Sequence, residues 1–115
     1  MKKAKIRTIQ RKKDKAARGA PPLEDAARGT LVERYLPCGK PGCACKKPGH
    51  KGHGPYHYLM IGHPRGRTQM TLIRRSQVPR VRMWVKHYKK IKSVLEKVTQ
   101  WNVQVLKLER DEENR

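Results

Sequence analysis

Residues 38–58 read CGKPGCACKKPGHKGHGPYHY, and this stretch decides how the rest of the chain can fold. It holds all three cysteines of the protein, Cys38, Cys43 and Cys45, and the histidines His50 and His53 follow shortly after them. Glycine, proline and lysine fill most of the positions between, and such residues are typical of tight turns rather than of helix or strand. Because this stretch can bury little apolar surface, a bound metal ion is the natural way to hold it in one conformation.

Three thiolates and one imidazole match the closed, four-coordinate site of a structural Zn²⁺. The sequence therefore predicts a zinc-knuckle-like loop with one structural zinc ion, held by Cys38, Cys43, Cys45 and His53. His53 is preferred as the fourth ligand because it lies where the loop meets an aromatic, strand-like segment, and His50 is the alternative. The single residue between Cys43 and Cys45 is a less usual spacing than two. A loop with free thiols and a redox or iron–sulfur site therefore remain alternatives.

The cysteine count also indicates a compartment. Three cysteines cannot all pair within one chain, and no apolar signal segment follows the first residues MKK. We therefore expect the reducing cytoplasm, where clustered cysteines more often bind metal than form disulfides. No apolar run is long enough for a membrane span, so no membrane partner is expected.

The segments CGKPGCAC and HGPYHYL, followed by a long basic helix, resemble a family of short uncharacterised prokaryotic proteins with the signature CGKPGCxC…HGPYxYL. The resemblance covers roughly residues 29–108, and its specific part matches Cys38, Cys43, Cys45 and His53. His50 and the basic N-terminus are additions to that pattern. The resemblance implies a domain of unknown function whose genes lie near transposases or other mobile elements, and hence an accessory role beside such an element.

Charge points to the class of partner. The chain carries 29 Lys and Arg against 9 Asp and Glu, a formal net charge of +20, and the excess runs through its whole length. Such a charge favours a polyanionic partner, so the sequence predicts binding to nucleic acid, DNA or RNA, and no small-molecule substrate. The residues predicted to contact phosphates are Lys40, Lys46, Lys47, Arg65, Arg67, Arg74, Arg75, Arg82, Lys86, Lys89 and Lys90.

The sequence offers little for catalysis. Its one cluster of reactive side chains is assigned to the metal, and neither paired carboxylates nor a glycine-rich phosphate motif occurs near it. We therefore expect no enzymatic activity. The alternative to a nucleic-acid-binding protein is a helical adaptor for a larger nucleic-acid enzyme.

The predicted fold is a small α+β domain. Residues 1–29 form a basic arm and linker, disordered when free, in which 2–18 could become a short helix on an anionic surface. Residues 30–75 hold the metal loop and a β-hairpin of 56–61 and 67–73. Residues 30–36 fit either a third strand, which we prefer, or a short helix with Leu31 and Tyr35 on one face. Alternation places Tyr56, Tyr58 and Met60 on one face and His57, Leu59 and Ile61 on the other.

Residues 76–110 show helical periodicity, with a basic first half and an acidic tail, 111–115, that we expect to fray. A helix of this length has more apolar surface than the small β unit can cover, so its second half predicts a homodimer or a helical partner protein. Asn102 stands at a core-like position and suggests a coiled coil whose register is set by asparagine. The residues predicted to contact that partner helix are Leu95, Val98, Trp101, Val105 and Leu108.

Overall fold

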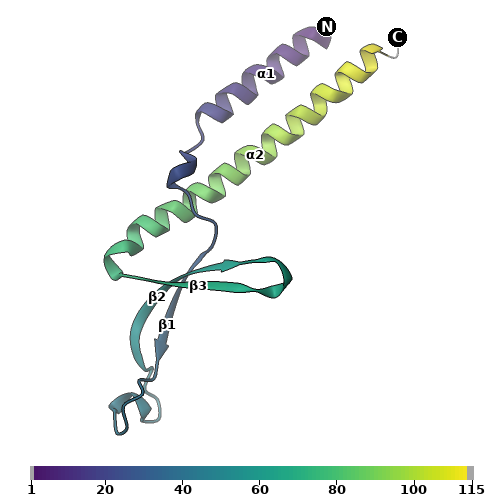
Figure 1. Cartoon of the computed structure of the whole chain (residues 1–115). Helices are drawn as coiled ribbons and strands as arrows, with labels where there is room; N and C mark the ends of the chain where they lie inside the picture. Colours follow the sequence, from purple (N-terminus) through teal and green to yellow (C-terminus); the bar gives the residue numbers. More distant parts are fainter. Residues whose placement is uncertain (1, 114–115) are drawn as a thin grey trace. The chain divides into compact units, whose positions relative to one another are not determined.

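The computed structural model describes residues 2–113 and has the small α+β fold expected from the sequence (Figure 1). Its elements in chain order are α1 (Lys2–Arg18), β1 (Thr30–Leu36), β2 (His53–Gly62), β3 (Thr68–Ile73) and α2 (Val78–Glu113). They form two compact units, a sheet unit of Ala27–Val85 and a helix-pair unit of residues 2–26 and 86–113. Residue 1 of the predicted arm and residues 114–115 of the predicted tail lie outside the described residues.

The sheet has three antiparallel strands in the order β1-β2-β3, so the predicted hairpin and third strand are both confirmed. In the register, Glu33 lies opposite His57, which in turn lies opposite Ile73 of β3. Since side chains alternate along a strand, these three residues share one face of the sheet. Tyr58, with Val32 and Leu72 as its cross-strand partners, lies on the other face.

The core of the sheet unit is small. Val81, in the first turns of α2, is 5% exposed. Cys45, in residues 37–52 between β1 and β2 (the metal loop), is 6% exposed, and no other residue of this unit is as buried. The backbone N–H of Ala27 donates to the carbonyl of Trp84 at 3.0 Å, and this bond ties the start of the unit to α2. So small an apolar core needs further support, which for domains of this size is often a metal ion.

Helix α1 is present where the sequence predicted a disordered arm. Its less exposed residues recur every three or four positions, at Lys2, Ile6, Ile9, Lys13 and Ala16, and Ile9 is only 8% exposed. The helix lies antiparallel beside the second half of α2 (Figure 1), where Lys13 Nζ donates to Asn102 Oδ1 at 2.7 Å. The sequence did not predict this apolar face because two of its five residues are lysines. The aliphatic part of a lysine side chain covers apolar surface while its charge stays in water.

Within α2 the half-buried line is Ile91, Val94, Val98, Trp101, Val105 and Leu108, with spacings of three and four. Leu95, which the sequence placed on this line, is 63% exposed. Asn102 is exposed and accepts a hydrogen bond from α1, so its predicted place in a core is wrong. The helix also continues through Glu113, where an acidic, frayed tail was expected. Glutamate and arginine favour helix, which explains why the pattern does not end at Asp111.

Candidate metal centre

The sheet brings the two ends of the metal loop together. Leu36 at the end of β1 pairs with His53 at the start of β2, so Cys38 and His53 leave the sheet close to each other. Gly52 makes this approach possible, because its φ is +97° and a Cβ there would lie 2.8 Å from the backbone carbon of Leu36. Only glycine fits both that conformation and that distance. The loop is therefore closed by strand pairing before any ligand is considered.

The four predicted metal ligands gather at this closed end of the sheet. Their ligand atoms, three Sγ and one imidazole nitrogen, all lie within 4.8 Å of one another. The Cys38 and Cys45 sulfurs are 3.5 Å apart, and Cys43 Sγ lies 3.2 Å from His53 Nε2. A 3₁₀ turn at Ala44–Lys46 directs Cys45 inward. The backbone N–H of Cys38 donates to Cys45 Sγ at 3.4 Å.

This donor set can be tested against zinc. With Zn–S of about 2.3 Å and Zn–N of about 2.0 Å, tetrahedral coordination places neighbouring sulfurs about 3.8 Å apart and sulfur and nitrogen about 3.5 Å apart. The observed 3.5 Å and 3.2 Å separations are within a few tenths of an ångström of these values. The cluster can hold a metal ion, and its three sulfurs and one nitrogen fit zinc better than magnesium or calcium, which take oxygen ligands.

The thiols of the cluster differ in acidity. The backbone N–H of Cys45, with hydrogen bonds from the side chains of Cys38, His53 and Cys45, lowers the pKa of Cys43 to about 6. The backbone N–H of Lys40 lowers the pKa of Cys38, but the Cys43 side chain, burial and the Cys45 side chain together raise it above its usual value. The lowered pKa of Cys43 favours its thiolate, which is the form of cysteine that binds metal.

His50, the alternative fourth ligand, is outside the cluster. Its Nδ1 accepts a hydrogen bond from the backbone N–H of Gly52 at 2.9 Å, within the turn that leads into β2. The ligand group formed by the described residues therefore contains His53, as preferred from the sequence.

The residues predicted to contact nucleic acid are all exposed, but they are spread over both units. Lys40, Lys46 and Lys47 lie in the metal loop, Arg65 and Arg67 at the tip of the hairpin, and Arg74, Arg75 and Arg82 between β3 and the first turns of α2. Lys86, Lys89 and Lys90 belong to the helix-pair unit. The structure thus groups eight of these eleven residues in the sheet unit.

Of the residues predicted to contact a partner helix, Val98, Trp101, Val105 and Leu108 are half-buried, and Leu95 is exposed. Helix α1 lies along this part of α2, and Leu108 lines one groove with Ile9 of α1. The second half of α2 therefore has a helical neighbour within its own chain.

Sequence reasoning did not find one further group, Glu33, His57, Arg75 and Arg82, which line a single pocket of the sheet unit. They come from three separate segments. Only the β1–β2 register, which places Glu33 opposite His57, would have brought two of them together.

Comparison with known proteins gives a family but no function. Neither the curated proteins nor the solved structures contain a significant match to this chain. Over the described residues, no helix combines the length and the apolar character that crossing a bilayer requires. A family model does match residues 3–83, which include all of α1 but its first residue, the metal loop and the whole sheet. The match begins well before residue 29, where the resemblance seen in the sequence begins. The chain therefore belongs to the family described as Domain of unknown function (DUF6788).

Proposed function

We propose that this protein binds nucleic acid, mainly through the phosphate backbone, and that a structural zinc ion holds its binding surface. The observation that carries this proposal is the charge of the sheet unit. Ala27–Val85 contains twelve Lys and Arg and one carboxylate, that of Glu33, and all twelve basic residues are exposed. Within residues 2–113 none of the twelve forms an ion pair with a carboxylate. A folded surface with so many unneutralised cations favours a polyanion.

The metal would act on this surface through the loop that it closes. Each of the lysines of this loop, Lys40, Lys46 and Lys47, lies within two residues of one of the cysteines, so fixing the cysteines would restrict the backbone from which they extend. Ordering a basic loop before binding lowers the entropy lost when it contacts phosphates. The metal then supports binding without taking part in any reaction.

Arg65 provides a second argument, from backbone conformation. It lies at the tip of the hairpin with φ 65° and ψ 30°, the left-handed region that glycine or asparagine usually occupies. For other residues this conformation costs about 1 kcal/mol. An exposed arginine held there, beside the equally exposed Arg67, is consistent with a requirement for its charge at the tip.

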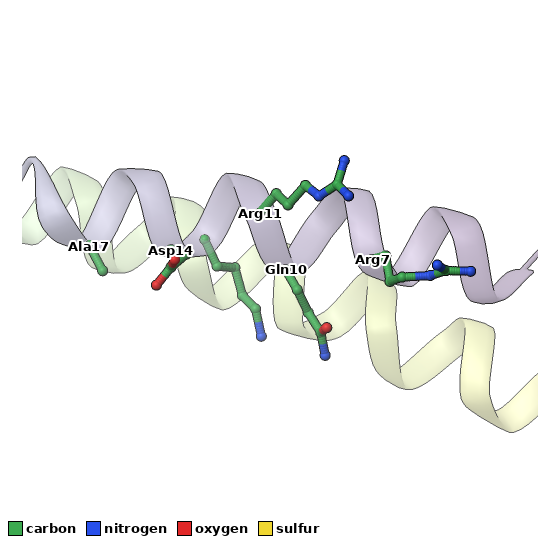
Figure 2. A pocket seen from close by; sticks show the side chains of 6 residues that line it. Arg7, Gln10, Arg11, Asp14 and Ala17 are labelled. Carbon is green, nitrogen blue, oxygen red and sulfur yellow. The ribbon is translucent and has the colours of Figure 1, made fainter.

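Helix α1 would add charge of a less specific kind. Figure 2 shows the side chains of Arg7 and Arg11 extending from α1. Both line an open hollow that is formed by residues of this one helix. Both arginines are exposed, and neither pairs with a carboxylate of the described residues. We expect α1 to contribute to affinity for all sequences alike, because phosphate contacts carry no sequence information.

A salt titration tests the proposal. Fluorescence anisotropy with duplex DNA, single-stranded DNA and structured RNA should show affinity that falls with salt, with a log–log slope of about −0.9 per neutralised phosphate on duplex DNA. Arg65→Gly should weaken binding without destabilising the protein, because glycine accepts a positive φ freely. Arg67→Gly removes the same charge at an ordinary φ of −72°, so it should weaken binding and lower stability.

Two results would contradict the proposal. Affinity independent of salt would mean that phosphate contacts do not drive binding. Unchanged affinity in both arginine variants, with binding lost on deletion of residues 2–18, would assign nucleic-acid contact to α1 alone and make the sheet unit a scaffold.

A helical adaptor for a larger nucleic-acid enzyme is the second candidate. It is favoured by Leu95 and Leu106, which are 63% and 65% exposed on α2 although leucine is usually buried. The resemblance to proteins encoded near transposases fits either function. Replacing both leucines with lysine should abolish recovery of a protein partner from cells under the adaptor hypothesis, and should leave nucleic-acid affinity unreduced under the main proposal.

A further inference from the structure

The sheet unit contains a pocket of about 490 Å³ that the proposed backbone contacts do not require. It lies where β1 and β2 meet the start of α2, and every residue that lines it belongs to the sheet unit. Arg75 and Arg82 line it on the side of α2, with His57 and Glu33 on the side of the sheet. The rest of the lining is Gly54, Pro55, Val78 and Pro79. The pocket thus combines two guanidinium groups, an imidazole, one carboxylate and a small apolar wall.

The two arginines have no partner that would occupy them. Neither forms an ion pair or a side-chain hydrogen bond with another residue among 2–113, and both are exposed. A guanidinium presents a planar set of donors that matches the oxygens of a phosphate, often through two parallel hydrogen bonds. Two such groups at one concave site match one phosphoryl group better than they match an extended backbone.

His57 is held by its surroundings. Its side chain is 14% exposed, and its Nδ1 lies 3.7 Å from Oε1 of Glu33, which is beyond hydrogen-bond distance but within that of an ion pair. Glu33 is the one carboxylate of the sheet unit, and the strand register places it directly opposite His57. The one carboxylate of a strongly basic unit therefore lies beside the histidine of this pocket, where it would repel an anion.

We propose that this pocket binds a terminal phosphate monoester, the phosphorylated end of a nucleic-acid strand, with Arg75 and Arg82 as the anion-binding residues and His57 as a further donor. A monoester carries nearly two negative charges at neutral pH and three free oxygens, whereas an internal phosphodiester carries one charge and two. Arg75 and Arg82 should therefore bind a phosphorylated strand end more tightly than an internal phosphodiester. Val78 and Pro79 form an apolar wall that the adjoining sugar can contact. This assignment rests on the proposed function, because it names the part of the nucleic acid that this site takes.

The test compares oligonucleotides of one sequence with a 5′-phosphate, a 3′-phosphate or hydroxyl groups at both ends, and adds a mononucleotide as a free ligand. Anisotropy should show about tenfold tighter binding to one phosphorylated form than to the hydroxyl form, since a charged hydrogen-bonded group has about that effect. Arg75→Gln and Arg82→Gln should remove this preference. Arg80→Gln is the matched control, because Arg80 stacks on Trp84 in the same helix and does not line the pocket. This variant should weaken the binding of all three oligonucleotides by the same factor and keep the preference for the phosphorylated end.

The outcomes separate this inference from the proposed function. Equal binding of phosphorylated and hydroxyl ends, or a preference that survives in Arg75→Gln and Arg82→Gln, overturns the inference while general nucleic-acid binding stands. A third outcome is that the mononucleotide binds, no oligonucleotide binds, and both arginine variants lose affinity for the mononucleotide. The pocket would then bind a free nucleotide, and the proposed function would be wrong. If neither kind of ligand binds, both are overturned.

Discussion

Replacing Cys45 with alanine separates a metal ligand from an ordinary core residue. Cys45 is 6% exposed, and its sulfur is 3.5 Å from that of Cys38. If the thiol only packs in the core, its loss removes one buried heavy atom and costs about 1 kcal/mol. If it binds a metal, it is one of four ligands of a site that in small zinc peptides contributes about 10–16 kcal/mol, and a quarter of that is roughly 3 kcal/mol.

Hydrogen exchange measured by mass spectrometry decides between these magnitudes. In the unmodified protein, a strong zinc chelator should speed exchange in residues 37–52 by orders of magnitude, because the metal would be the main constraint on this loop. In Cys45→Ala the loop should already exchange fast, and the chelator should add nothing. Val81→Ala is the matched control, because Val81 is 5% exposed in the same unit but is not a ligand. Relative to the unmodified protein, this variant should speed exchange by the same factor whether or not the chelator is present.

One result would refute the reasoning. If the chelator leaves exchange of residues 37–52 unchanged in the unmodified protein, and Cys45→Ala costs only about 1 kcal/mol, the cluster is a packed set of free thiols. The binding surface would then have to be ordered without a metal.

Three further predictions follow from the site and the helix pair. His53→Ala should lose bound zinc in elemental analysis while His50→Ala keeps it, since His53 lies in the ligand cluster and His50 does not. The reverse result would identify His50 as the fourth ligand. Ile9→Ala should lower the free energy of unfolding, measured in thermal melts, by about 2 kcal/mol, because it leaves a cavity against α2. Gln10, the next residue, is exposed, and an equal loss in Gln10→Ala would contradict the packing of Ile9 against α2. In metal-free protein, Cys43 should be alkylated at pH 7 faster than an ordinary thiol, and the rate should fall as the pH drops below about 6 and the thiolate is protonated; an ordinary rate profile would contradict the lowered pKa.

The strands and the ligand set could be read from the sequence because their signals are local. The aromatic and β-branched residues of 56–61, the turn at 62–66 and the alternation in 68–73 each determine structure within a few positions. The same holds for Cys38, Cys43 and Cys45, which lie in one turn-rich segment. His53 could be preferred over His50 only from its position next to a strand, and the pairing of Leu36 with His53 is the physical reason for that preference.

The features that the sequence did not reveal depend on contacts between distant segments. Helix α1 is stabilised by a stretch of α2 more than eighty residues away, as the hydrogen bond from Lys13 to Asn102 shows, and no local signal reports such a partner. Glu33 and His57 come together only through strand register. Leu95 was misplaced because several stripes of α2 are apolar, and the position of α1 decides which of them is covered.

The antiparallel helix pair has a consequence for the order of folding. Its two members, α1 and the second half of α2, are separated in the sequence by the three strands of the sheet and the first turns of α2. During synthesis α1 is therefore made before the strands and before its helical partner in α2, and it can pair only after both have been made. Closing a long flexible loop costs entropy, and a sheet unit that folds first, around a metal ion if the cluster binds one, would shorten that loop. If the cluster binds zinc as proposed, depletion of zinc during synthesis should slow the pairing of two helices that contain none of the four ligands.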